Sequence, residues 1–183
     1  NSDTYSVANP ALSPDEKTLY FASDMPGTLG ESDIFKVSIN EDGTYGTPEN
    51  LGNNINTEGR ETFPFVTSKS ILYFSSDGHP GLGGLDVFAT KIAHDDYSGT
   101  VLNVGEPVNS NMDDFTFIFN EDNRRGFYAS NRDGGKGGDD IYSFLETRPL
   151  EFECNQPITG TVRDKITNQP LAGATVKVID ENN

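Results

Sequence analysis

LYFASD (19–24), LYFSSD (72–77) and GFYASN (126–131) are three occurrences of one short pattern, and that pattern decides the fold. A second pattern follows each of them, as GESDIF (30–35), GGLDVF (83–88) and GGDDIY (137–142). The step from Tyr20 to Tyr73 is 53 residues, and the step from Tyr73 to Phe127 is 54. A third block, LGNNINT (51–57), returns once as VGEPVNS (104–110) in the same register. Three blocks in one register indicate an internal repeat of about fifty residues.

Each repeat has the pattern of four short strands. In the first repeat we expect strands over 10–12, 18–23, 33–39 and 45–51, with turn residues such as Pro14 and Gly43 between them. No helical periodicity of useful length appears. A four-stranded antiparallel unit repeated at this spacing predicts a blade of a β-propeller. The third repeat has no fourth strand after Leu145, which is typical of a last blade whose outer strand comes from the other end of the ring.

The repeat also points to a family. The stretch NPALSPDEKTLYFASD (9–24), followed by GESDIF, resembles the WD-like propeller repeat of the TolB type. The second and third copies depart from it only in their turns, TSKS (67–70) and NEDNRR (120–125). The resemblance implies an all-β chain in which residues 1–148 form part of a β-propeller, with about three four-stranded blades visible.

The end of the chain has a different residue pattern, in which Thr, Val and Ile alternate with polar residues. The segment ITGTVRDKITNQPLAGATVKVID (158–180) resembles the start of a carboxypeptidase regulatory-like domain, a transthyretin-like β-sandwich. The matching positions are Gly160, Val162, Asp164, Pro170, Leu171, Gly173, Ala174, Val176 and Val178. We expect a linker over 149–157 and the first two sandwich strands over 158–183. Because two strands alone are marginal in water, they need a further partner.

A TolB-type propeller followed by such a sandwich resembles the OmpA-family peptidoglycan-associated envelope proteins, which include accessory proteins of type IX secretion. This resemblance implies a periplasmic, outer-membrane-associated location and protein partners in the cell envelope. It also implies peptidoglycan binding through an OmpA-like domain that is not in this chain. Residue 1 is Asn, no leader pattern follows it, and the chain stops without a terminating signal, so we expect an excerpt of a longer protein.

Composition excludes several classes of partner. Asp and Glu number 29 against 13 Lys and Arg, which gives a formal net charge of −16. With no basic stripe to neutralise phosphates, we expect neither nucleic acid nor anionic lipid as a partner. No apolar run approaches the roughly 20 residues that cross a bilayer, so we expect no direct membrane insertion. Hydrophobic residues are only 33% of the chain, yet 12 Phe and 7 Tyr in short dense runs indicate a folded protein.

The carboxylates that recur with the repeat are the first candidates for chemistry. A catalytic pair is used once per molecule and would break the repeat, whereas these carboxylates follow it. We therefore expect them to cap backbone amides in the loops between second and third strands. The alternative is weak calcium binding by Gly-rich, Asp-bearing loops, although no EF-hand spacing occurs. The residues concerned are Asp24, Asp33, Asp77, Asp86, Asp139 and Asp140.

Other candidate groups also favour a module without an active site. His79, His94 and Cys154 are too few and too far apart in sequence for a zinc site, and no GxSxG motif occurs. The run GGKGG (134–138) lacks the phosphate-loop pattern and matches a blade loop. Acidic neighbours disfavour a reactive thiolate at Cys154. Five aromatic residues could form either a recognition surface or part of the core: Tyr5, Tyr45, Tyr97, Phe115 and Phe117.

These observations predict a non-catalytic protein-binding and scaffolding module, with no catalytic, cofactor-binding or metal-binding residues and no cofactor. Two alternatives remain open. One is an enzyme-associated propeller that gates a hydrolase or processes glycans, and a unique cluster of buried carboxylates would favour it. The other is an adhesion module stabilised by calcium.

Overall fold

The computed structural model describes residues 2–92, 97, 99–152 and 159–177. The chain divides into two compact units, Asn1–Phe152 and Glu153–Asn183. Within the described residues there is no helix, and three antiparallel sheets of four, four and three strands are present, none of them closed into a barrel. The all-β class expected from the sequence is therefore confirmed. No helix capable of spanning a membrane occurs in these ranges.

All three sheets belong to the first unit, and each is built from strands that follow one another in sequence. The first sheet is β1 (Val7–Leu12), β2 (Thr18–Ser23), β3 (Asp33–Ser38) and β4 (Glu49–Asn50). The second is β5 (Glu61–Val66), β6 (Ile71–Ser76), β7 (Asp86–Lys91) and β8 (Leu102–Asn103). The third is β9 (Asp114–Asn120), β10 (Arg125–Ser130) and β11 (Asp140–Leu145).

The first sheet differs from its sequence expectation at both edges. β1 begins at Val7 rather than at residue 10, and its pairing with β2 shifts register between Ala8 and Ala11. The outer strand expected over 45–51 is only the two-residue β4, while Tyr45 makes an isolated bridge to Ile39. Pro48 has no backbone N–H to give to the ladder, which explains why the strand does not extend towards Tyr45.

The internal repeat extends to unusual backbone angles. The non-glycine residues Asn9, Phe63 and Thr116 have φ of 52°, 50° and 54°, and they occupy equivalent places in β1, β5 and β9. Register shifts mark the same place in all three sheets. A left-handed residue with a register shift is the mark of a β-bulge, which bends the strand locally. All three sheets therefore carry the same built-in bend.

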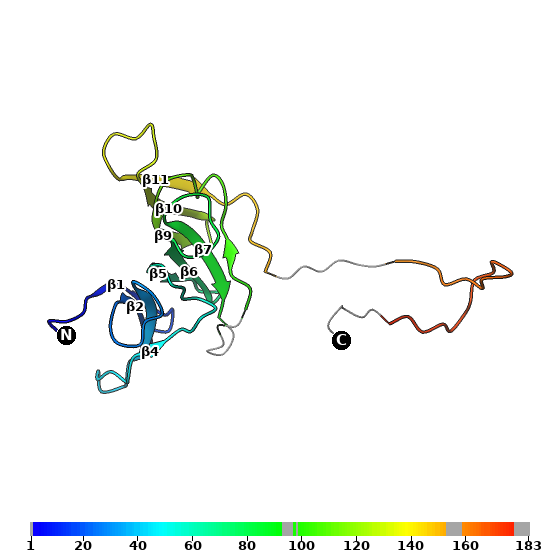
Figure 1. Ribbon diagram of the computed structural model, residues 1–183, viewed down its shortest axis with the longest axis horizontal. Helices are drawn as coiled ribbons and strands as arrows, with labels where there is room; N and C mark the ends of the chain where they lie inside the picture. Colours follow the sequence, from blue (N-terminus) through cyan, green and yellow to red (C-terminus); the bar gives the residue numbers. More distant parts are fainter. Residues whose placement is uncertain (1, 93–96, 98, 153–158, 178–183) are drawn as a thin grey trace. The chain divides into compact units, whose positions relative to one another are not determined.

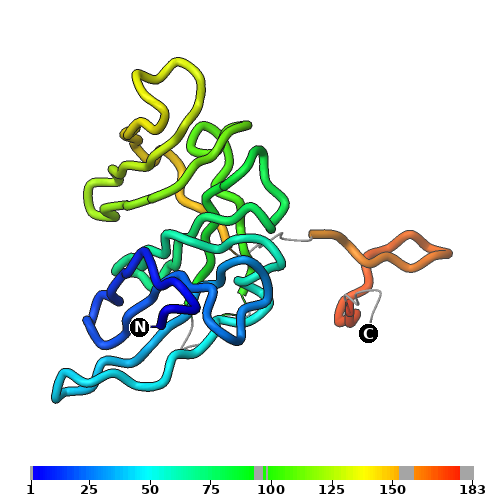
Figure 2. The backbone as a smooth tube through the Cα atoms, turned by 60° about the vertical axis from the view of Figure 1, so that its left-hand side comes forward, coloured from blue at the N-terminus to red at the C-terminus, as the bar shows by residue number. Residues whose placement is uncertain are grey.

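The sheets pack face to face, with the second between the first and the third (Figures 1 and 2). One core joins Tyr20, Ala22 and Ile34 of the first sheet to Leu72, Phe74 and Phe88 of the second. The other core joins Tyr73, Val87 and Ala89 of the second sheet to Phe117 and Tyr128 of the third. We call the side of each sheet that carries Tyr20, Ala22 and Ile34, or their equivalents in the other repeats, its forward face. The opposite side, which carries Leu19, Phe21 and Phe35 or their equivalents, is its backward face.

The segment expected as a linker starts by packing on the first unit. Leu150 and Phe152 lie against the core between the second and third sheets. In the second unit, residues 159–177 contain a turn at Asp164 and a single bridge between Arg163 and Pro170, but no strand. Its apolar side chains, Ile166 among them, are exposed. The two sandwich strands expected here are therefore not formed within 159–177.

Candidate functional site

The repeated aspartates before the third strands hold their own loops. Oδ2 of Asp86 accepts backbone N–H groups from Leu82 at 2.6 Å and Gly83 at 3.0 Å. Asp33 does the same with Leu29 at 2.8 Å, and Asp140 with Lys136 and Gly137. These are the amide caps that the sequence predicts. The run GGKGG is accordingly the loop between β10 and β11, shaped by Asp140.

The residues that directly follow the second strands do not cap the loop to the third strand, although the sequence predicted this for Asp24 and Asp77. They cap the backbone just before the first strand, whose start lies beside the end of the second. Asp24 accepts the N–H of Ser6, and Asp77 accepts the N–H of Arg60 at 2.7 Å. Asn131, the third equivalent, accepts the N–H of Asp113 at 2.8 Å. The carboxylate of Asp77 also pairs with the guanidinium of Arg60 and raises the pKa of Arg60. Asp139 is exposed in its loop, and Asp24 and Asp77 are exposed as well.

Two buried asparagines that sequence reasoning missed join successive sheets. Asn56 lies before β5, yet its amide binds both backbone groups of Ile34 in β3, with Oδ1 2.8 Å from N and Nδ2 3.0 Å from O. Asn109 binds Val87 in the same way, at 2.8 and 2.9 Å. Each side chain gives a buried backbone N–H its partner, and it adds a second hydrogen bond to a carbonyl that already accepts from the N–H of Leu51 or Val104.

Glu61 and Asp114 form a second pair of equivalent residues, both fully buried at the start of the inner strands. Glu61 accepts hydrogen bonds from the backbone and hydroxyl of Thr57, each at 2.7 Å, and from the hydroxyl of Ser76 at 2.6 Å. Asp114 accepts from the backbone and hydroxyl of Ser110 at 2.6 and 2.8 Å. Both carboxylates are therefore engaged in fixing the connection between sheets.

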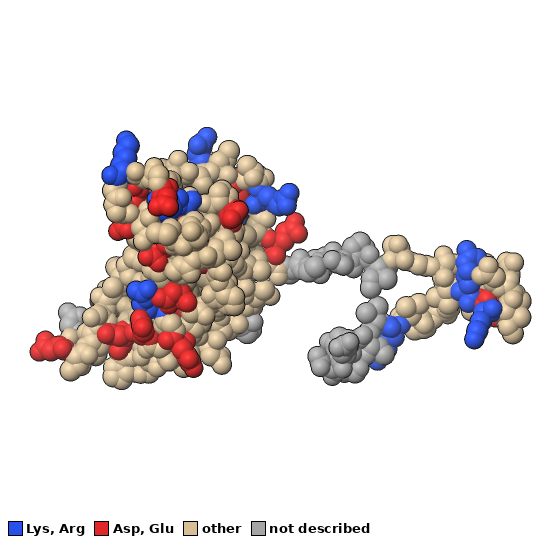
Figure 3. Space-filling view, turned by 45° about the horizontal axis from the view of Figure 1, so that its top comes forward, with Lys and Arg blue, Asp and Glu red and all other residues tan. Residues whose placement is uncertain are grey.

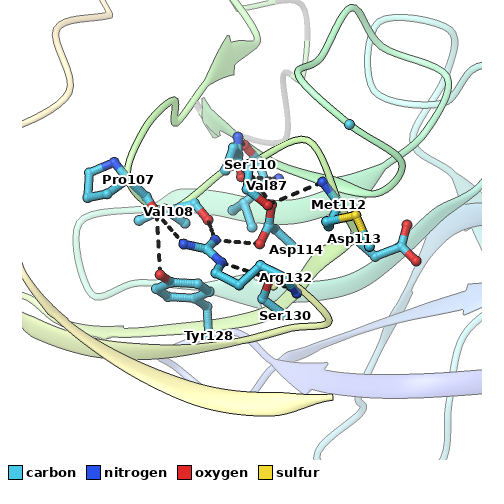
Figure 4. Close-up of polar contacts among 12 residues, drawn as sticks. Val87, Pro107, Val108, Ser110, Met112, Asp113, Asp114, Tyr128, Ser130 and Arg132 are labelled. Carbon is cyan, nitrogen blue, oxygen red and sulfur yellow. Dashed lines mark hydrogen bonds and ion pairs between the residues drawn. The ribbon is translucent and has the colours of Figure 1, made fainter. Parts of the chain in front are cut away.

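The junction between the first and second sheets and the junction between the second and third sheets differ in the side chain that donates to a backbone carbonyl. Figure 4 shows the second of these junctions. His79 Nε2 lies 2.8 Å from the carbonyl oxygen of Ile55. At the equivalent carbonyl, that of Val108, the donor is Nη2 of Arg132, which also pairs with Asp114 at 2.6 Å. The Arg132 guanidinium stacks over the Tyr128 ring, 4.9 Å from its centroid. His79 and Arg132 thus bind equivalent backbone carbonyls, the first with an imidazole nitrogen and the second with a guanidinium nitrogen.

Two carboxylate oxygens in the described part of the chain remain buried without a partner. They are Oδ1 of Asp33 and Oδ1 of Asp86, which are repeat equivalents. No group of three or more His, Cys, Asp or Glu side chains placed to hold a metal ion occurs among the described residues. On the face in Figure 3, acidic side chains are spread over the first unit and basic ones stand among them, with no continuous basic stripe.

The remaining sequence candidates separate into core and surface. Tyr97 and Phe117 are buried, so the recognition surface considered for them is wrong: Tyr97 lies hydroxyl to hydroxyl with Tyr20 at 3.0 Å, and Phe117 stacks on Tyr73. Phe115 is half-buried and Tyr45 is exposed. His94 and Cys154, which were considered as zinc ligands, lie outside the described residues.

Taken together, the buried polar groups of this unit hold loops and join sheets. Their repetition from one junction to the next is what a structural network requires, and it is not what a single reaction centre requires. No protein-family model matches the chain, and no curated protein is detectably similar to it.

Proposed function

We propose that the three sheets are consecutive blades of a TolB-like, WD-like β-propeller, and that this propeller is a non-catalytic protein-binding and scaffolding module. The observation that carries the proposal is the repetition of the whole junction. Asn56 and Asn109, Glu61 and Asp114, and the two apolar cores recur in one register. Blades of a propeller are related in this way, by a rotation that brings each onto the next.

The non-catalytic role is supported by how the carboxylates are used. Glu61 and Asp114 each accept at least two hydrogen bonds from neighbouring loop groups. A general acid or base needs an oxygen that faces a substrate, and these oxygens face the protein's own donors. A rigid scaffold that displays its connecting loops is a common basis for binding a partner.

The cellular setting follows from the family resemblance alone. By that analogy the module belongs to a periplasmic, outer-membrane-associated complex with a role in type IX secretion. It would be tethered to peptidoglycan through an OmpA-like domain that follows the regulatory-like sandwich, which starts at residue 158.

The test is made in cells that produce the full-length protein, with a photo-crosslinking residue in place of Leu82, whose side chain is 49% exposed in the loop before β7. We expect a covalent adduct with an envelope protein, recovered together with peptidoglycan. The matched site is Leu171, which is 48% exposed in the second unit and should give a different adduct pattern. Recovery of the protein in the cytosolic fraction would contradict the proposal.

One observation favours the calcium-stabilised alternative. The unpartnered buried oxygens of Asp33 and Asp86 repeat, and calcium prefers carboxylate and carbonyl oxygens. If calcium binds there, EDTA lowers the melting temperature and added Ca²⁺ restores it, whereas Mg²⁺ does not. An unchanged melting temperature removes this alternative.

A further inference from the structure

The third sheet of the first unit leaves its forward face uncovered. On the forward face, Tyr20 and Tyr73 are each 3% exposed, whereas their equivalent Phe127 is 50% exposed. Ile34 and Val87 are both 0% exposed, whereas their equivalent Ile141 is 80% exposed. The third sheet therefore shows to solvent the positions that the first and second sheets bury against the next sheet.

The backward face of the first sheet is only partly open. Phe21 and Phe35 are 5% and 3% exposed in a small core of their own, and the exposed apolar positions lie on β1. β5 packs across the forward face of the first sheet, and β9 packs across that of the second. β1 is the equivalent strand, and Val7 at its start is 50% exposed. Val66 of β5 is buried in the first core, whereas its equivalent in β1, Leu12, is 49% exposed. An apolar hollow next to it is lined by Leu19, Phe21, Met25 and Val37.

The loop that meets the next sheet repeats the same contrast. A Cβ added to Gly30 would lie 2.4 Å from the backbone of Glu58, and one added to Gly83 would lie 2.4 Å from the carbonyl oxygen of Met112. These glycines let the loop approach the following sheet closely. At the third equivalent, Gly137, the nearest atom would be 3.7 Å away. Position 137 therefore holds the glycine that a close approach needs, yet no following sheet lies against it among the described residues.

We propose that the forward face of the third sheet binds the backward face of the first sheet of a second copy, so that the chain associates head to tail. The argument is continuity with two existing junctions, whose apolar faces and glycine recur here. In this arrangement Leu12 of one copy lies over Phe127 and Ile141 of the other. The backbone N–H of Val7 donates to the carbonyl of Asp139, as Asp114 N–H donates to Leu85 in the second junction.

Two such contacts close a ring of two copies. Six sheets fall within the range of four to eight blades in which propellers close, and closure would cover the exposed apolar side chains of β1 and of the third sheet. This closed form rests on the proposed propeller architecture. The contact itself rests only on the equivalence of the faces.

The experiment is sedimentation equilibrium of the 183-residue chain at concentrations up to about 200 µM, at which even a weak contact is populated. We expect the mass to rise towards twice 19.9 kDa. A mass of 19.9 kDa throughout would overturn the proposal and would leave these faces to further sheets of a longer chain or to another protein. That outcome leaves the scaffold function standing, because the cell experiment on that function tests location and partner and not self-association.

Surface substitutions locate the contact without disturbing the fold. Ile141→Glu and Leu12→Glu should each weaken association at least about tenfold, because the contact would bury an unpaired carboxylate. The matched controls are Ile166→Glu and Leu171→Glu, at residues 93% and 48% exposed in the second unit, and they should leave association unchanged. Gly137→Ala should also weaken association while the melting temperature of the dilute chain stays the same. Equal effects of the controls would overturn the proposal.

Mixing distinguishes head-to-tail pairing from a symmetric contact. The Ile141→Glu variant keeps an intact first sheet, and the Leu12→Glu variant keeps an intact third sheet. A mixture of the two therefore regains one native contact, and we expect a mass above that of either variant alone. No gain on mixing would show that the copies do not pair head to tail.

Discussion

At the scale of single residues, the structure depends on a few polar side chains that serve the backbone of the neighbouring sheet. Asn109 is the clearest case, because it pairs both the N–H and the C=O of Val87. Replacing Asn109 with Ala leaves the buried N–H of Val87 without its partner, while the Val87 carbonyl keeps its hydrogen bond from Val104 N–H. We therefore expect the free energy of unfolding to fall by roughly 1–3 kcal/mol. Denaturant titration measures the change. Asn111→Ala, at an exposed position two residues away, should lie within about 0.5 kcal/mol of the parent.

A second residue-scale prediction concerns pH. Burial raises the pKa of Tyr73, and the charges of Glu146 and Glu121 raise it further. Because the folded pKa lies above the unfolded value near 10, the stability from Tyr73 is complete below about pH 10 and is lost as pH rises through the folded pKa. The Tyr73→Phe variant lacks this loss, so its stability should fall less steeply above pH 10, by up to about 1.4 kcal/mol per pH unit.

The control for this pH prediction is Tyr45→Phe, at a tyrosine that is 61% exposed. Its alkaline stability profile should follow that of the parent. Urea titrations at intervals between pH 8 and 11.5 compare the three proteins. Parallel profiles for Tyr73→Phe and the parent would show that ionisation of Tyr73 is not coupled to unfolding.

At the scale of the element, each junction needs a loop that comes very close to the next sheet. Gly83 has a backbone carbonyl 2.4 Å from the place where a Cβ would stand. We expect Gly83→Ala to destabilise the chain by about 1–3 kcal/mol, the usual effect of overpacking. Gly137→Ala, at the equivalent place beside the third sheet, is the control and should leave the dilute chain as stable as the parent. A thermal melt of both variants decides the matter.

Individual strands and loops also show how much of the fold the sequence could predict. The apolar stretch at 18–23 predicted a strand at its observed bounds, because alternating large side chains in one register are strong local signals. Asn56 and Asn109 were visible as part of a repeated block, but their role was not, because their partners lie 22 residues earlier in another sheet. Recurrence of the block did not single them out, and only the fold shows what they bind.

Outer strands were the least predictable elements. The stretch 45–51 was expected to be a strand, yet only Glu49–Asn50 pairs with β3. An outer strand gains little from packing, so turn residues and Pro48 decide its length, and local propensity carries less information there. The tail beyond residue 158 was judged from motif order alone, and the bridge between Arg163 and Pro170 is the only pairing that residues 159–177 contain.

At the scale of the whole molecule, net charge opposes both folding and association. The formal charge is −16, and acidic side chains are spread over the visible face of the first unit (Figure 3). Mutual repulsion of this kind destabilises the compact state and keeps copies apart, and salt screens it over about 10 Å at 0.1 M ionic strength. Ion pairs such as Arg60 with Asp77 and Arg132 with Asp114 cannot reverse the balance, because 29 acidic side chains face only 13 basic ones.

We therefore expect NaCl to raise the melting temperature at pH 7 and to strengthen head-to-tail association. Near pH 5, closer to the sequence pI of 4.3, the net charge is smaller and both effects should shrink. Apolar burial is also strengthened by some salts, so the chloride series is compared with sucrose, which stabilises by exclusion and leaves charge unscreened. A salt effect of equal size at pH 5 and pH 7 would show that repulsion between acidic groups does not limit this protein.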